Sequence, residues 1–169
     1  AAGAAKTVTV PVNVQPDPRG DFVTNDDGVL VEYRGTDPNI RIPEGVTGIG
    51  SSFSSIALDS VWVPASVRTI DDRAFYGTGL KEITFQDDKA HPSQLATIGD
   101  RAFQSTSLAT ITLPGSVVTI GDNAFAGMSR LTSVRLGAKV AAGQLVAAFP
   151  GAKALASIEV DANNRNYAS

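Results

Sequence analysis

The sequence predicts a β-rich repeat protein, a stack of small units that combine short strands with short helical turns. A signature of isoleucine, three variable residues, alanine and phenylalanine recurs at residues 70–75, 98–103 and 120–125, with a diverged copy at 49–53. Five phenylalanines recur with it, 22, 28, 22 and 24 residues apart: Phe53, Phe75, Phe103, Phe125 and Phe149. Self-similarity at such a period indicates units that cannot bury an apolar face alone and therefore stack on one another.

Each unit is expected to contain a strand that follows its phenylalanine. Five or six residues after each phenylalanine, a leucine opens the pattern Leu-x-x-(Val/Ile)-x-apolar, at residues 58–63, 80–85, 108–113, 131–136 and 155–160. The apolar positions alternate with others, which is typical of a half-buried strand. Pro64 and Pro114 follow two of these segments, and proline ends a strand because it cannot donate to the ladder. A second extended segment follows, at residues 46–49, 67–70, 95–98 and 117–120.

The chain of each unit then turns at an acidic or hydroxyl residue. These residues stand before the Ala-Phe pairs, at Asp72, Asp100 and Asp122, with Ser51 in the diverged copy. A side-chain oxygen there can accept from the free N–H groups that open a helical turn, so we expect helix N-caps. A column of catalytic carboxylates or calcium ligands is a poorer interpretation, because successive copies lie one repeat apart and no bidentate glutamate closes a site.

These motifs resemble the BspA-like leucine-rich repeats of bacterial surface and secreted proteins. The family pattern Leu-x-x-Ile-x-Leu-Pro-x-Ser-Val-x-x-Ile-Gly-x-x-Ala-Phe-x-Gly-Cys is met almost letter for letter by residues 108–127, and degenerate copies extend the match over about residues 26–169. The resemblance implies an α/β-type, β-rich, right-handed leucine-rich repeat solenoid, with a parallel sheet on its concave side and short helical turns. It also implies export from a bacterial cell and a role in adhesion or recognition.

The chain departs from this family pattern in two ways. The usual cysteine is replaced by Thr78, Thr106, Met128 and Ala152. The unit at residues 131–154 lacks both the proline and the Ile-Gly-Asp turn, so the array either tapers or bends there.

One unit is lengthened to 28 residues by an insertion at residues 86–93, which contains His91, the only histidine. Extra residues in a repeat form a surface loop. A solvated loop histidine is the simpler interpretation, because a catalytic base needs a nucleophile and a supporting shell.

The chain divides into an N-terminal leader, residues 1–25, and the solenoid, residues 26–169. In the leader, valine at every second position of residues 8–14, with Pro11 among them, predicts an edge strand. We favour packing of this strand on the cap over a disordered leader or a strand added to another molecule's sheet. Residues 26–48 are expected to form the cap, followed by about five repeats of which the last is truncated.

The composition of the chain disfavours several classes of function. The chain has 14 basic and 17 acidic residues, a net charge of -3 and no cysteine. Capture of nucleic acid is disfavoured because phosphate binding needs clustered basic residues, and no apolar run is long enough to span a membrane. Without cysteine, disulfides and thiolate zinc sites are excluded. We expect a monomer with no catalytic residue, cofactor or metal site.

The candidate partner-binding residues belong to the Leu-x-x-Ile-x-Leu strands. The residue between the two inward apolar positions points outward, so aligned units place these residues in one row. The row consists of Trp62, Thr84, Thr112, Arg135 and Glu159, and Glu82 lies beside it. Tryptophan and arginine are frequent binding hot spots, although packing of the cap on Trp62 is equally compatible with the sequence.

The sequence therefore predicts a non-enzymatic extracellular module that binds a protein or a glycan through its concave sheet. Two alternatives remain open. One is a structural spacer or capping segment of a larger bacterial surface protein, which a smooth face without a partner would favour. The other is an enzyme, which the single histidine and the lack of cysteine disfavour.

Overall fold

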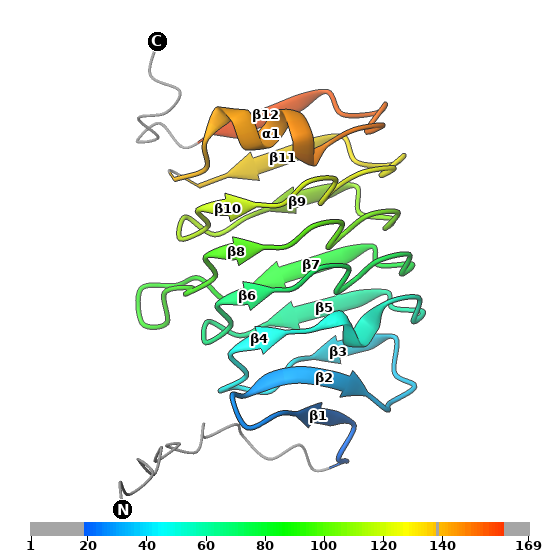
Figure 1. Ribbon diagram of the computed structural model, residues 1–169, viewed down its shortest axis with the longest axis vertical. Coiled ribbons are helices and arrows are strands. Elements are labelled where there is room, and N and C mark those ends of the chain that lie inside the picture. The colour runs from blue at the N-terminus through cyan, green and yellow to red at the C-terminus, as the bar shows by residue number, and fades with distance from the viewer. Residues whose placement is uncertain (1–18, 138, 161–169) are drawn as a thin grey trace, which may run out of the picture.

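The computed structural model describes residues 19–137 and 139–160, which form a continuous stack of turns (Figure 1). The strand expected at residues 8–14 lies outside the described residues. In chain order the elements are β1 (Phe22–Thr24), β2 (Val29–Tyr33), β3 (Asn39–Arg41), β4 (Gly48–Ile49), the 3₁₀ helix η1 (Ser51–Phe53), β5 (Ser60–Val63), β6 (Thr69–Ile70), β7 (Glu82–Phe85), β8 (Thr97–Ile98), β9 (Thr110–Thr112), β10 (Thr119–Ile120), β11 (Ser133–Leu136), α1 (Ala142–Ala148) and β12 (Ser157–Val160).

The strands form parallel ladders between neighbouring units, which confirms the predicted β-rich leucine-rich repeat solenoid. The short strands make one six-stranded sheet in the order β1-β2-β4-β6-β8-β10, in which only β1 and β2 pair antiparallel. Strand β1 lies in the segment that the sequence assigns to the leader. The longer strands make two three-stranded parallel sheets, β3-β5-β7 and β9-β11-β12.

A column of phenylalanine rings runs through the stack. The centroids of the Phe53, Phe75, Phe103, Phe125 and Phe149 rings follow one another at 5.3, 5.2, 5.4 and 4.8 Å, with interplanar angles of 9° or less. The first four rings are fully buried. The spacing is close to the roughly 4.8 Å between hydrogen-bonded strands, so each ring lies on the equivalent ring of the next unit.

The column continues into the N-terminal hairpin through two rings that do not belong to the repeats. The Tyr33 ring lies 5.5 Å from that of Phe53, and the Phe22 ring lies 5.0 Å from Tyr33. The Tyr33 hydroxyl donates to the Asp37 carbonyl over 3.2 Å, and burial raises the pKa of this hydroxyl. The hairpin therefore covers the first repeat with aromatic surface.

The Ala-Phe segments are successive hydrogen-bonded turns, and they bond mainly to the next unit. The Phe75 N–H donates to the Ala102 carbonyl and the Phe103 N–H to the Ala124 carbonyl, each over 2.8 Å. Within a segment the bonds span three residues, as from the Ala74 N–H to the Asp71 carbonyl. Short helix occurs among the described residues only as η1 and α1.

The prediction that the turn residues are helix N-caps is wrong. Asp72 Oδ1 accepts from the Asp100 N–H at 2.8 Å, and Asp100 Oδ1 accepts from the Asp122 N–H at 2.9 Å. Ser51 is the first residue of η1, whose N-cap is Gly50 without a side-chain cap bond. Because no helix follows the aspartates, the nearest free donor is the backbone of the equivalent residue one unit further along.

The Ile-Gly-Asp turn needs glycine because neighbouring units approach closely there. A Cβ atom on Gly121 would lie 2.6 Å from the Asp100 nitrogen, and one on Gly99 would lie 2.6 Å from the Asp72 nitrogen. Real Cβ atoms essentially never come so close to backbone atoms. The glycine thus lets one turn lie directly on the turn of the preceding unit.

The unit that lacks the Ile-Gly-Asp turn continues the stack by means of a helix. In residues 131–154, α1 replaces the second strand and the turn, and its Ala147 and Ala148 carbonyls accept from the Asn123 and Phe125 N–H groups over 2.8 Å. Helix α1 packs beside β10, at the end of the six-stranded sheet. This covers a strand edge that would otherwise be open to pairing with another chain.

Three of the four positions of the family's cysteine are buried, and the fourth, Ala152, is half-buried. Thr78, Thr106 and Met128 are 2%, 4% and 0% exposed. The Thr78 hydroxyl donates to the Phe75 carbonyl over 3.0 Å, so a polar side chain is accommodated there by a local bond.

Replacing Phe103 with alanine is expected to destabilise the protein by about 3–5 kcal/mol, because it removes a fully buried ring with a stacked partner on each side. At about 2–4 °C per kcal/mol for a chain of this size, the melting temperature should fall by roughly 6–20 °C. Thermal melts followed by circular dichroism measure this. A fall of less than a couple of degrees would show that the ring column does not stabilise the fold.

Replacing Gly121 with alanine should cost about 1–3 kcal/mol, because its Cβ would meet backbone atoms of the preceding turn. Gly115→Ala is the matched control, since nothing lies within 4 Å of a Cβ built there. Chemical denaturation of both variants gives the two free energies of unfolding. Equal stabilities would show that the close approach is not what requires glycine.

Candidate functional site

The predicted binding residues lie on one face, the outer face of β3, β5, β7, β9, β11 and β12, here named the long-strand face. Trp62 is in register with Thr84 on β7, and Arg135 is in register with Thr112 on one side and Glu159 on the other. Glu82 pairs with Ser60, one position before Thr84 and Trp62. These side chains are exposed, except that of Trp62, which is half-buried.

Trp62 packs against the cap, which is one of the two alternatives that the sequence leaves open. The guanidinium carbon of Arg41, on β3, lies 3.3 Å from the centroid of the indole ring, which is a close cation–π contact. Arg41 Nη2 also lies 3.8 Å from Glu44 Oε1. One face of the indole is therefore covered by the cap, and the chain itself already provides an arginine partner for this aromatic ring.

The row of outward residues is interrupted between Thr84 and Thr112. No ladder joins β7 to β9, which belong to different sheets. The β5–β7 ladder begins with a hydrogen bond from the Glu82 N–H to the Asp59 carbonyl over 3.1 Å. At the corresponding place before β9, the Ser107 N–H donates to the Leu80 carbonyl over 2.9 Å instead.

The opening is confined to the long-strand face. On the opposite sheet β6 and β8 pair in register, and the Phe75 and Phe103 rings remain 5.2 Å apart. The two units are therefore as firmly stacked as the others through their core and turns, and only the long strands separate.

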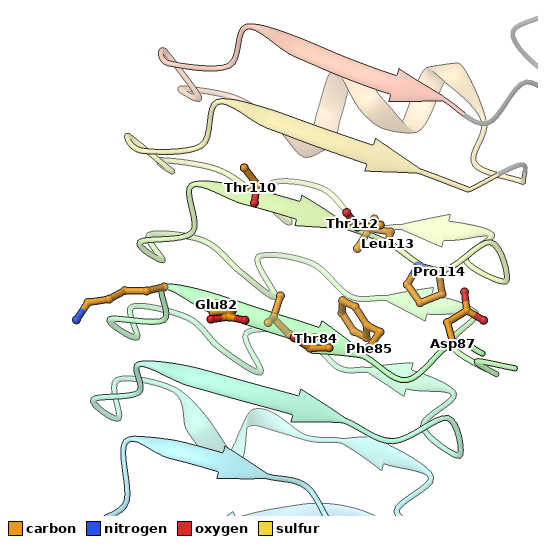
Figure 2. A pocket seen from close by; sticks show the side chains of 10 residues that line it. Glu82, Thr84, Phe85, Asp87, Thr110, Thr112, Leu113 and Pro114 are labelled. Carbon is orange, nitrogen blue, oxygen red and sulfur yellow. The ribbon is translucent and has the colours of Figure 1, made fainter. Parts of the chain in front are cut away.

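A groove of about 530 Å³ lies at this opening (Figure 2). It is lined on one side by residues 81–85 and Asp87, and on the other by Thr110, Thr112, Leu113 and Pro114. Its volume is within the roughly 300–1,000 Å³ of typical ligand sites. Three of the predicted binding residues, Glu82, Thr84 and Thr112, thus line one groove.

Two features of the 28-residue unit coincide with the groove. The last inward position of the strand holds Phe85, where the neighbouring units have smaller aliphatic side chains that are fully buried: Val63, Leu113 and Leu136. Both Phe85 and Ile83 are only half-buried. The insertion begins directly after Phe85, so the larger ring and the extra chain both lie where the strands part.

The insertion forms a loop that projects from the stack beside β8, as expected from the sequence (Figure 1). Its ends meet at Ala65, whose N–H donates to Gln86 Oε1 over 3.0 Å and whose carbonyl accepts from the Gln94 N–H over 2.9 Å. Asp88 Oδ1 accepts from the His91 and Ala90 N–H groups at 2.8 Å. The His91 N–H bond is the main cause that holds the pKa of Asp88 below its usual value.

The sequence did not predict the groove. The strand at residues 80–85 fits the Leu-x-x-Ile-x-apolar pattern as well as its neighbours. The signals that could have indicated it are the phenylalanine at position 85 and the length of this unit. Asp87, Thr110 and Pro114 are lining residues that the row of outward positions does not include.

In the part of the chain that the structure describes, no group of three or more histidine, cysteine, aspartate or glutamate side chains is arranged to hold a metal ion. His91 lies in the loop, with Nδ1 3.4 Å from Asp88 Oδ1. No helix among residues 19–137 and 139–160 has the length and apolar character needed to cross a membrane.

Comparison with known proteins agrees with this geometry. A sequence profile described as the BspA type leucine rich repeat region matches residues 36–142 in six copies, which is more than half of the chain. A search among curated proteins finds no match.

The solved structures that share the fold include the following two. The pneumococcal vaccine antigen PcpA superposes with a TM-score of 0.61 at 21% identity, over 91% of this chain and 51% of that one. A leucine-rich repeat protein of T. pallidum, TpLRR, superposes with a TM-score of 0.51 at 27% identity, over 70% of each chain. The chain therefore spans about half the length of the PcpA structure.

Deleting residues 87–92 should leave the fold intact, because the ends of the loop already meet at Ala65 and the deletion restores a 22-residue spacing between Phe75 and Phe103. Shortening a surface loop changes closure entropy by less than about 1 kcal/mol. Circular dichroism and thermal melts of the deletion variant test this. Loss of soluble, folded protein would show that the insertion is part of the stack.

Proposed function

Because the chain belongs to the BspA-type leucine-rich repeat family, we propose that it is a non-enzymatic module that recognises a protein or a glycan through the long-strand face. The family supports a binding or a structural role, and the resemblance to bacterial surface and secreted proteins supports a place on or outside a bacterial cell. We further propose that the chain acts as a monomer, without cofactor or metal and without nucleic acid as a partner.

The observation that carries the proposal is the row of exposed polar and charged side chains held by the ladders. Thr112, Arg135 and Glu159 are paired in register on adjacent strands, so their spacing is set by main-chain hydrogen bonds. A surface held in this way loses little conformational freedom on binding, which favours affinity.

The size of the row indicates the size of the ligand. Trp62 lies on β5 and Arg135 on β11, with β7, the groove and β9 between them, so their separation is at least about three strand spacings of roughly 5 Å. A ligand that contacts both is on the scale of a protein surface or an oligosaccharide.

A spacer or capping segment of a larger surface protein is the second candidate. The contact of Arg41 with Trp62 favours it, because it uses the strongest predicted anchor within the chain itself. Under this alternative the long-strand face has no partner, and Trp62 contributes to the stability of the cap.

Arg135→Ala should weaken ligand binding at least fivefold while leaving the melting temperature nearly unchanged, since truncating a hot-spot side chain costs more than about 1 kcal/mol. The ligand is first selected from panels of purified extracellular matrix proteins and oligosaccharides by surface plasmon resonance, which then gives the dissociation constants. Arg130→Ala is the matched control, because Arg130 is exposed in the turn before β11 and its substitution removes the same charge.

Equal weakening by Arg130→Ala would argue against the long-strand face. If no panel member binds, and Trp62→Ala lowers the melting temperature of the N-terminal part, the spacer alternative is the better description.

A further inference from the structure

We propose that the groove between β7 and β9 is a slot for the guanidinium group of an arginine on a partner protein. This rests on the proposed function and narrows it to a protein ligand. The inference follows from the direction of the main-chain groups, the charges at the groove, its aromatic surface and its size.

The main-chain groups at the groove include hydrogen-bond acceptors that a ladder would have used. Alternate residues of a parallel strand bond to opposite neighbours. The Glu82 and Gln86 N–H groups donate to the β5 side, so the carbonyls of Ile83 and Phe85 are directed to the groove. Because β9 does not pair with β7, these carbonyls lack the strand partner that would saturate them. The N–H groups of Ile83 and Phe85 point the same way, so the open edge offers donors as well as acceptors. A guanidinium, with five donors and no acceptor, can bond to the carbonyls of this edge.

The side chains at the groove add negative charge. The carboxylates of Glu82 and Asp87 lie toward opposite ends of the groove, with Phe85 between them (Figure 2). Lys81 is the cation of the lining, and its Nζ lies 2.7 Å from Asp59 Oδ1, so its charge is already compensated. The carboxylates of Glu82 and Asp87 therefore leave the groove with a negative charge, which is complementary to a cation.

Phe85 provides a surface for a planar cation. Its ring is half-buried and lines the groove, and arginine stacks on aromatic rings more readily than lysine does. The same face holds an example of this contact on the adjacent strands β3 and β5, where Arg41 lies over Trp62 at 3.3 Å with Glu44 close to its guanidinium.

The width of the opening favours a side chain over an added strand. Insertion of a strand between β7 and β9 needs about two strand spacings, roughly 9.6 Å. Cα atoms of β7 and β9 come within 8 Å of one another, so the strands would have to move apart first. A guanidinium group on an extended side chain is narrower than a strand and needs less separation of β7 and β9.

The test is a titration of ¹⁵N-labelled full chain with the peptide acetyl-Ser-Arg-Ser-amide, followed by NMR. Amide shifts should concentrate at residues 82–87 and 110–113. The same peptide with citrulline, which has the shape of arginine without its charge, should bind at least tenfold more weakly, because hydrogen bonds to charged groups are about twice as strong. The double variant Glu82→Gln, Asp87→Asn should also lose at least tenfold. Asp26→Asn with Asp122→Asn, which removes two exposed carboxylates away from the groove, should change nothing.

Three results would overturn the slot: no shifts at the groove, equal binding of the citrulline peptide, or equal weakening by the control pair. Groove shifts with acetyl-(Ser-Val)₃-amide, and none with the arginine peptide, would indicate strand addition instead. Failure of the slot is distinguishable from failure of the proposed function, because loss of ligand binding in Arg135→Ala is measured on different residues with a different ligand.

Discussion

The structure depends on hydrogen bonding between neighbouring units at a single spacing. A lone unit buries too little apolar surface to offset the entropy of ordering its chain, so the units are stable only as a stack. The parallel ladders impose about 4.8 Å per rung, and the phenylalanine rings follow at 5.2–5.4 Å along Phe53, Phe75, Phe103 and Phe125. The glycine of the Ile-Gly-Asp turn and the aspartate that bonds to the next unit are both consequences of that close approach.

Neighbouring units are joined by several separate connections, which explains how the long-strand face can open without loss of the stack. Each pair of units is joined through the short strands, the turns and the ring column as well as through the long strands. Between β7 and β9 the last of these connections is absent and the other three are retained. The walls of the groove are therefore held by the three remaining connections, and a site supported by its scaffold is favourable for recognition.

The repeat period predicted the elements that follow from local pattern: the strands after each leucine, the buried ring column and the loop at the insertion. The features that it missed depend on neighbours in space. The partner of Asp72 is set by the distance to the next unit and not by the local turn. The sequence is compatible with packing of the cap on Trp62, but no repeat pattern identifies Arg41 as the residue that makes the contact. The opening beside Phe85 is an absence of pairing between β7 and β9, which a period-2 pattern within one strand does not describe.

The bond from the Asp72 carboxylate to the Asp100 backbone, repeated from Asp100 to Asp122, gives the stack a translational symmetry. Each such unit accepts on one side with its side chain and donates on the other with its backbone, so it is complementary to a copy of itself displaced by one rung. Tandem duplication or loss of a whole unit conserves these bonds and requires no new type of contact. A change of length by part of a unit has no such route: residues 86–93 leave the stack as a loop, and residues 131–154 replace the second strand and the turn with α1. The arrangement thus allows evolution by whole units while the register stays fixed.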